Sequence, residues 1–198
     1  RLRHRGAMWH SRSWARYSGA MSAIQSLPDL WLLSDARNDV MLDTALHSFR
    51  DPIGFVFRHY HLPPEERFAR WLSLRRIALA EGHLAILADD ALTAREWGAD
   101  GIYGAPRALC PCRANLLTIA TAHNMREIAQ ANRAGADAVM LSPVFPTRSH
   151  PDAKTLGPIR FLHMARHARM PVIALGGMTQ RSAHRLRWPR WAAIDGLT

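Results

Sequence analysis

Short apolar runs alternate along the chain with longer stretches in which apolar residues recur at helical spacing. The apolar runs cover residues 30–33, 53–57, 84–88, 102–103, 116–120, 138–141, 172–175 and 192–194. Short runs that are apolar throughout are typical of parallel strands covered on both faces. Helices are expected at about 38–48, from Pro63, up to about Trp97, after a cap at Asn124, from about Leu156 and from Thr179.

Strands that alternate with helices form a parallel sheet, and eight such units close into a (β/α)8 TIM barrel. About 25 residues per unit suits a compact barrel. An open doubly wound sheet is the alternative, but no Gly-x-Gly-x-x-Gly motif follows the first strand. The last strand lies close to Thr198, so we expect a barrel that lacks its last helix, with an exposed edge and uncovered apolar side chains.

Composition favours one globular domain, because 48% of the 198 residues are hydrophobic. Residues 1–27 contain five arginines ahead of the first acidic residue, Asp29, and show no periodicity. We interpret them as a disordered basic extension that precedes a barrel at 28–198. The formal net charge of +10 comes almost entirely from arginine, yet nothing beyond this stretch resembles a nucleic-acid module.

No apolar run approaches the roughly 20 residues that a membrane span needs. Cys110 and Cys112 are separated by a single proline, which is poor geometry for a disulfide, and two sulfurs cannot complete a structural zinc site. Free thiols in a reducing compartment are the simplest interpretation, so we expect a cytoplasmic protein.

In a barrel the carboxyl ends of all strands share one face, where active sites lie. The residues that follow the predicted strands are rich in charges and hydroxyls: Asp35, Arg58, Asp89, Asp90, Tyr103, Thr121, His123, Thr147, Arg148, Ser149, His150, Gly176 and Gly177. Because arginine binds phosphate well, this set favours a phosphorylated substrate. Gly176 and Gly177 could present backbone N–H groups to a phosphate, and a plain tight turn is the alternative.

His123 is the candidate for proton transfer, because imidazole titrates near neutral pH and this one follows a strand. A structural histidine at a helix start is the alternative. Asp89 and Asp90 carry oxygen ligands for Mg²⁺, although acidic residues also favour helix N-termini. His59 and His61 alternate like a ligand pair, but solvent-facing residues at the rim are the simpler interpretation.

Two runs resemble the thiamine phosphate synthase and thiazole tautomerase superfamily: Gly135-Ala136-Asp137 through Val144-Phe145-Pro146-Thr147-Arg148-Ser149-His150, and Pro171-Val172-Ile173-Ala174-Leu175-Gly176-Gly177-Met178-Thr179. Thr121-Ala122-His123 is similar to its Ser-x-His motif. Leu32-Leu33-Ser34-Asp35, Phe57-Arg58 and Leu87-Ala88-Asp89 resemble the ends of its first three strands. The resemblance covers about residues 29–196 and implies a compact barrel with a role in thiamine biosynthesis.

A synthase of this superfamily joins an aminopyrimidine diphosphate to a thiazole phosphate and releases pyrophosphate with the help of Mg²⁺. By resemblance, Arg58 would meet the diphosphate and Asp89 the metal. Lys154 would stand in for a family lysine that is replaced by His150. The implied substrate and phosphate contacts are Thr121, Thr147, Ser149, His150, Lys154, Gly176 and Gly177. The oligomeric state, including a homo-oligomer, is left open.

The chain departs from the family pattern around the metal. Ala88 replaces the asparagine beside the metal aspartate, and residues 105–108 lack the second metal carboxylate. Each lost electrostatic contact typically costs about 10²–10³ in rate. The tautomerase branch needs no metal, moves a proton on a thiazole carboxylate phosphate, and uses the histidine that His123 matches.

Three hypotheses follow: a synthase-type transferase with Mg²⁺, a metal-independent tautomerase that uses His123, and a non-catalytic barrel that binds a phosphorylated thiazole or a partner. The whole set of motifs favours the synthase, which is our primary prediction.

Overall fold

The computed structural model describes residues 27–109, 116–148, 154–195 and 197, along which strands and helices alternate. In order these are β1 (Leu30–Leu33), α2 (Asp39–Ser48), β2 (Gly54–Phe57), α3 (Pro64–Ala80), β3 (Leu84–Leu87), α4 (Ala91–Glu96), β4 (Gly101–Gly104), β5 (Leu117–Ala122), α5 (Met125–Ala134), β6 (Ala138–Leu141), α6 (Gly157–Ala165), β7 (Val172–Ala174), α7 (Gln180–Leu186) and β8 (Trp191–Ala193). The expected strands are confirmed, each within two residues of its predicted limits.

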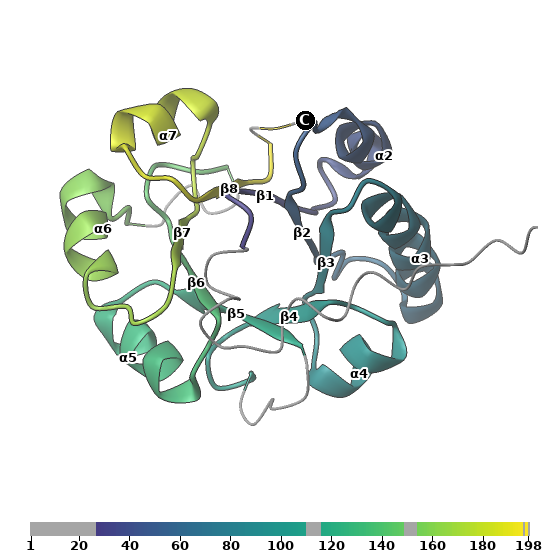
Figure 1. Cartoon of the computed structure of the whole chain (residues 1–198), viewed down its shortest axis with the longest axis horizontal. Helices are drawn as coiled ribbons and strands as arrows, with labels where there is room; N and C mark the ends of the chain where they lie inside the picture. The colour runs from purple at the N-terminus through teal and green to yellow at the C-terminus, as the bar shows by residue number, and fades with distance from the viewer. Residues whose placement is uncertain (1–26, 110–115, 149–153, 196, 198) are drawn as a thin grey trace, which may run out of the picture.

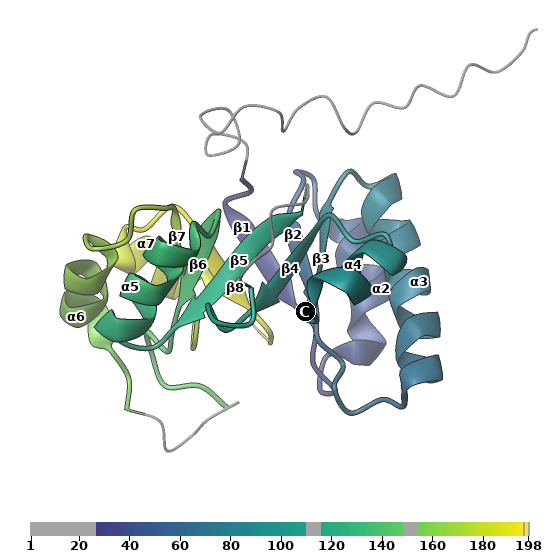
Figure 2. The same ribbon diagram turned by 90° about the horizontal axis from the view of Figure 1, so that it is seen from below.

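The strands are parallel and pair in chain order, and β8 pairs back onto β1. Figure 1 shows the resulting ring of strands, with the helices arranged around its outside. The view in Figure 2 shows the helices lying against the outer face of the strands. The predicted compact (β/α)8 barrel is therefore confirmed, and the carboxyl ends of its strands share one face.

The seam between β8 and β1 holds the barrel closed. Three residues of each strand are paired in register, and the buried Asn38 joins the two strands beyond their carboxyl ends. Asn38 Nδ2 donates to the carbonyl oxygen of Leu33 at 3.0 Å and to that of Ile194 at 2.9 Å. The expected exposed barrel edge is therefore wrong, because β8 has a partner strand on each side.

The ring of helices is open between α7 and α2, and no helix follows β8 in the part of the chain that the structure describes (Figure 1). Leu32 of β1, in the outer layer, is nevertheless completely buried and shares its hydrophobic cluster with Leu42 and Leu46 of α2. Trp191 of β8 is partly buried against the same cluster. The expectation of uncovered apolar side chains is wrong for Leu32, which packs with α2, whereas Trp191 remains partly exposed.

Helix ends are set by the residues that the sequence pattern marks. Asn124 caps α5 by accepting a hydrogen bond from the N–H of Glu127, as predicted. Gly135 ends the same helix with φ of 67°, a left-handed conformation that glycine adopts without strain. Asp90 caps α4 through the N–H groups of Leu92 and Thr93. The helix-terminus alternative for Asp90 is therefore confirmed.

The barrel interior is filled by side chains, among which Trp31 is the largest and is fully buried. Its indole N–H donates to the carbonyl oxygen of Pro28 at 2.8 Å. Trp31 pairs in register with Gly54 of β2, and a Cβ atom on Gly54 would collide with the indole ring. The glycine therefore makes room for the tryptophan at the centre of the barrel.

No helix in the described ranges is both long and apolar enough to cross a membrane. Residues 1–26, Cys110 and Cys112 lie outside the described residues, so the basic extension and the free thiols stay predictions.

We expect Gly54→Ala to lower the free energy of unfolding by about 1–3 kcal/mol, because the added methyl group overpacks the barrel interior. Gly104→Ala is the matched control, because a Cβ atom there has its nearest neighbour, Leu109, at 3.8 Å. The control should change the free energy by less than about 1 kcal/mol in urea unfolding. Equal effects of the two variants would contradict the packing role of Gly54.

Candidate active site

Two adjoining cavities lie at the carboxyl ends of the strands. The first has a volume of about 360 Å³, and the second, between the loops after β6, β7 and β8, has a volume of about 290 Å³. The predicted site residues that line the first are Arg58, Thr121, His123, Thr147 and Gly176. Gly177 and Arg148 line the second, and Thr147 and Gly176 border both. The cavities therefore form one cleft across the barrel face.

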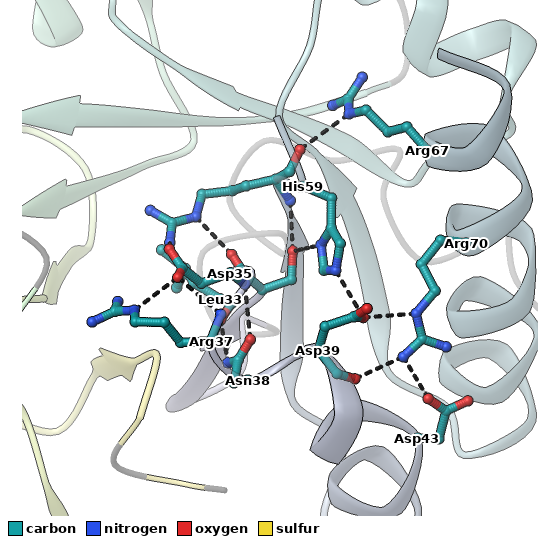
Figure 3. Close-up of polar contacts among 11 residues, drawn as sticks. Leu33, Asp35, Arg37, Asn38, Asp39, Asp43, His59, Arg67 and Arg70 are labelled. Atoms are coloured by element: carbon teal, nitrogen blue, oxygen red, sulfur yellow. Dashed lines mark hydrogen bonds and ion pairs between the residues drawn. The ribbon is translucent and has the colours of Figure 1, made fainter. Parts of the chain in front are cut away.

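Arg58 is held rigidly at the edge of the cleft, directly after β2. Its backbone N–H donates to Ser34 Oγ at 2.7 Å, its Nε to the Ser34 carbonyl oxygen at 2.8 Å, and its Nη2 to Asp35 at 2.9 Å. Asp35 also accepts from Arg37 Nε (Figure 3). Burial alone would raise the pKa of Asp35, but the bond from Arg37 and the charge of Arg58 bring it below its ordinary value. The carboxylate thus stays charged and fixes the guanidinium.

One ring nitrogen of His123 is held by a hydrogen bond, and the other is available to a ligand. Its Nδ1 lies 2.9 Å from the carbonyl oxygen of Ser142, which can only accept. Nδ1 therefore carries a hydrogen, and in the neutral form of the ring the lone pair is on Nε2. The backbone N–H of His123 donates to Glu127 at 2.6 Å, which fixes the start of the loop. Because His123 lines the cavity, Nε2 is the atom able to exchange a proton with a ligand.

Gly176 and Gly177 form a turn that only glycine fits. Their φ angles are 94° and 61°, and added Cβ atoms would meet Pro143 and Pro146 of the loop after β6. Within the described residues, no hydrogen bond takes up the N–H groups of these two glycines. The turn can therefore offer two donors to an anion beside Arg148. Thr179, in contrast, is engaged in a capping box with Ser182 at the start of α7.

Tyr103, one of the residues collected at the predicted strand ends, and Ser142 also line the first cavity. Burial raises the pKa of Tyr103 to about 12, even though the nearby Arg58 partly lowers it. The phenol is therefore protonated at neutral pH and can donate a hydrogen bond to a ligand. Ser142 directly follows the predicted strand 138–141, and the same signal could have identified it.

Of the two histidines after β2, one lies where the sequence predicts and the other does not. His61 is exposed at the rim, as expected, but His59 is only 1% exposed. Its Nδ1 lies 2.7 Å from Ser34 Oγ and its Nε2 lies 2.8 Å from Asp39 Oδ1. The rim interpretation of His59 is wrong, because its ring turns inward and stacks on Phe57 with a centroid distance of 4.6 Å.

Some predicted residues lie apart from the cleft. Lys154 is exposed and lines neither cavity. Ser149 and His150 lie outside the described residues, so their roles stay predictions. Asp89 also lies outside both cavities and is paired with Arg67 of α3, which no pattern in the sequence had connected with it.

Comparison with known proteins identifies the family of this chain. The family model for thiamine monophosphate synthase matches residues 41–194. The chain belongs to this family. The thiamine-phosphate synthase of Geobacillus thermodenitrificans is 32% identical over 145 residues, which are 69% of this chain and 64% of the relative. That of Chloroflexus aurantiacus is 31% identical over 133 residues, which are 64% of this chain and 62% of the relative.

The solved structures agree on the fold. Thiamine phosphate pyrophosphorylase from Pyrococcus furiosus superposes with a TM-score of 0.69 at 23% identity, over 84% of this chain and 85% of that one. The alignments to the curated relatives are shorter: those to the Geobacillus and Chloroflexus synthases and to one from Listeria monocytogenes span between 50% and 64% of each relative's length.

The residues around Asp89 do not fit the Mg²⁺ that the family resemblance implies. Arg67 Nη1 donates to Asp89 Oδ2 at 2.6 Å, and the N–H of Asp90 donates to Oδ1 at 2.9 Å, so both carboxylate oxygens have donors. Arg67 also donates to the carbonyl oxygens of Arg58 and Ala88. A guanidinium in contact with the carboxylate repels a second cation. Nowhere in residues 27–109, 116–148 and 154–195 do three His, Cys, Asp or Glu side chains gather as a metal site would require.

We expect stability to decline as the pH falls through the ordinary range of histidine. Burial lowers the pKa of His59, with small contributions from His61 and Arg70, and outweighs the opposing effect of Asp39. The unfolded chain therefore binds a proton below about pH 6.5 that the folded chain binds only at lower pH, so the folded state loses stability as the pH falls.

The loss should reach about 1.4 kcal/mol for each unit by which the pKa is lowered. Urea unfolding at pH 7.5, 6.5 and 5.5 measures it, and His59→Asn should reduce this decline. An equal decline in the wild type and in the variant would contradict the assignment to His59.

Proposed function

We propose that the chain is a thiamine-biosynthesis transferase of the synthase type, which joins an aminopyrimidine diphosphate to a thiazole phosphate and releases pyrophosphate. One observation carries the proposal: in a member of the thiamine monophosphate synthase family, an anchored cation, Arg58, lines the first cavity of the cleft and the Gly176–Gly177 turn lines the second. Two anionic substrates require two separate anion-binding regions, and the cleft has both.

The proposed roles follow the geometry of the cleft. The N–H groups of Gly176 and Gly177, with Arg148, would bind the thiazole phosphate in the second cavity. Arg58 would bind the diphosphate in the first cavity and neutralise the negative charge that grows as pyrophosphate leaves. Thr121 and Thr147 would contact the substrates between Arg58 and the glycine turn. Because Asp35 and Ser34 hold Arg58 in place, little reorganisation is needed at the moment of reaction.

Mg²⁺ enters no step of this proposal, because Arg67 already pairs with Asp89. The charge of the leaving group would be balanced by the arginines of the chain. We keep Asp89 as a positioning partner of Arg67, which in turn contacts the Arg58 backbone at 3.1 Å.

A second candidate function is favoured by His123 and by the same Arg67–Asp89 pair. A tautomerase moves a proton on a thiazole carboxylate phosphate and needs an acid/base but no metal. His123 Nδ1 is bonded to the Ser142 carbonyl oxygen and the residue lines the cavity, so Nε2 is the ring atom available to exchange a proton. The third candidate, a barrel that binds a phosphorylated thiazole without reaction, uses the same glycine turn and requires no catalytic group.

We expect purified protein to release pyrophosphate when both substrates are present, and not when the thiazole phosphate is omitted. Arg58→Gln should lower kcat about 100-fold, because it removes the cation that balances the departing charge. Arg160→Gln is the matched control, because this arginine is exposed on α6 and its replacement makes the same charge change. A folded wild-type protein that releases no pyrophosphate would contradict the synthase proposal.

For the second candidate, we expect the wild type to exchange a ring proton of thiazole carboxylate phosphate with solvent deuterium, followed by NMR. His123→Ala should slow the exchange by about 10²–10⁴-fold, because it removes the acid/base group, while ligand affinity should change only a few-fold. Exchange that survives in His123→Ala would eliminate this histidine as the proton carrier. Binding without either reaction would favour the non-catalytic barrel.

A further inference from the structure

A buried histidine that the proposed chemistry does not use lies next to Arg58. His59 follows Arg58 in the chain, and its side chain is fully enclosed. Its φ of 37° is in the left-handed region, which non-glycine residues adopt at a cost unless their surroundings hold them there. The conformational cost and the burial both indicate that contacts of the ring stabilise this backbone conformation.

The hydrogen bonds of His59 have a defined direction. The Asp39 carboxylate can only accept, so His59 Nε2, 2.8 Å away, carries the hydrogen. In the neutral ring Nδ1 is then an acceptor, and Ser34 donates its hydroxyl hydrogen to it over 2.7 Å. Ser34 Oγ keeps its lone pairs for the backbone N–H of Arg58, which donates to it at 2.7 Å. The chain of donors thus runs from Arg58 through Ser34 and His59 to Asp39.

The far end of this chain is anchored on two helices. Asp39 begins α2, and Arg70 of α3 donates from Nε to its carboxylate at 2.7 Å and from Nη2 to its carbonyl oxygen at 2.8 Å. Arg70 also pairs with Asp43 at 2.6 Å, and Figure 3 shows His59, Asp39, Arg70 and Asp43 following one another. Burial alone would raise the pKa of Asp39, but the bonds from Arg70 and His59 bring it below its ordinary value. Asp39 therefore remains a charged acceptor.

The near end of the chain holds the cation of the cleft at two points. The backbone N–H of Arg58 donates to the Ser34 hydroxyl, and Arg58 Nε donates to the Ser34 carbonyl oxygen. Ser34 is completely buried, so no water can replace the hydroxyl as the acceptor of the Arg58 N–H. A change in the orientation of the Ser34 hydroxyl is therefore transmitted to Arg58.

We propose that His59 is a positioning residue that orients Ser34, and through it Arg58, for binding of the diphosphate group. The proposal rests on the proposed function only in that Arg58 binds the diphosphate. It adds that a neutral histidine outside the cleft, together with Asp39 and Arg70, sets the affinity of the cleft for this group.

Two replacements of His59 separate its two hydrogen bonds. In His59→Asn, the side-chain oxygen lies near the position of Nδ1 and can accept from Ser34, but the shorter side chain does not reach Asp39. Asparagine also tolerates the left-handed backbone. In His59→Gln, the amide nitrogen reaches toward Asp39, but no acceptor remains where Ser34 donates.

The measurement is the dissociation constant of inorganic pyrophosphate, by isothermal titration calorimetry, with the melting temperature recorded for each variant. We expect Arg58→Gln to weaken binding about 10-fold or more, and His59→Gln and Ser34→Ala to weaken it about 3- to 10-fold. His59→Asn should keep the affinity within about 2-fold, since it retains the acceptor for Ser34.

His83→Gln is the matched control. His83 is also a buried histidine, whose Nδ1 accepts from the N–H of Ile53 and whose Nε2 donates to the carbonyl oxygen of Leu46, and it lines neither cavity of the cleft. Its replacement should lower the melting temperature and leave the pyrophosphate affinity unchanged. Loss of stability alone is thus separated from loss of positioning.

A double-mutant cycle gives the decisive readout. If Ser34 acts through Arg58, Ser34→Ala weakens binding in the wild type and produces no further weakening in Arg58→Gln. Equal weakening in both backgrounds, or unchanged affinity in Ser34→Ala and His59→Gln, overturns the inference. Ser34→Cys, similar in size with a weak hydrogen-bonding group, replaces Ser34→Ala if that variant does not fold.

The outcomes also separate this inference from the proposed function. If Arg58→Gln weakens pyrophosphate binding while the Ser34 and His59 variants do not, only the inference is overturned. If Arg58→Gln has no effect, or the wild type binds no pyrophosphate, the assignment of Arg58 to the diphosphate is wrong and the inference falls with it.

Discussion

The pairing of β8 with β1 is the constraint on which the cleft depends. The loop residues that form it follow different strands and come together only because the strands close into a ring. Asn38 reinforces the closure, since its side-chain amide donates to the carbonyl oxygens of Leu33 and Ile194, the latter 156 residues away in the sequence. Without this seam, Ile194 after β8 would not lie across from Arg58 after β2, and the first cavity, which both residues line, would be open.

Paired charges organise the side of the cleft formed by β1, β2 and β3. Asp35 pairs with Arg58 between the loops after β1 and β2, Asp89 pairs with Arg67 between the loop after β3 and α3, and Asp39 pairs with Arg70 between α2 and α3. The arginines are partly buried, so screening by solvent is incomplete and the geometry is well defined. Pairing with Asp35 fixes Arg58 for an anion, whereas pairing with Arg67 removes Asp89 as a ligand for a cation.

The fold could be predicted from the sequence because its signals are local. β1 and β6 have the predicted limits, since each is a short apolar run bounded by polar or small residues. The cap at Asn124 was also predictable, because a capping side chain bonds within its own helix turn. A parallel barrel puts the residues that follow its strands on one face. The line-up of such residues around one cavity was therefore also predictable: Arg58, Thr121, His123, Thr147 and Gly176.

The environment of each side chain was not predictable in the same way. The sequence by itself determined the strands, their parallel order and the family, because hydrophobic period, turn residues and motifs are written in adjacent positions. Only the tertiary structure decided that His59 turns inward, that Arg67 pairs with Asp89 and that Asn38 bonds to Ile194 across the seam. These three outcomes depend on contacts between residues far apart in the chain, and the free energy of such a contact depends on burial and distance, which no local pattern records.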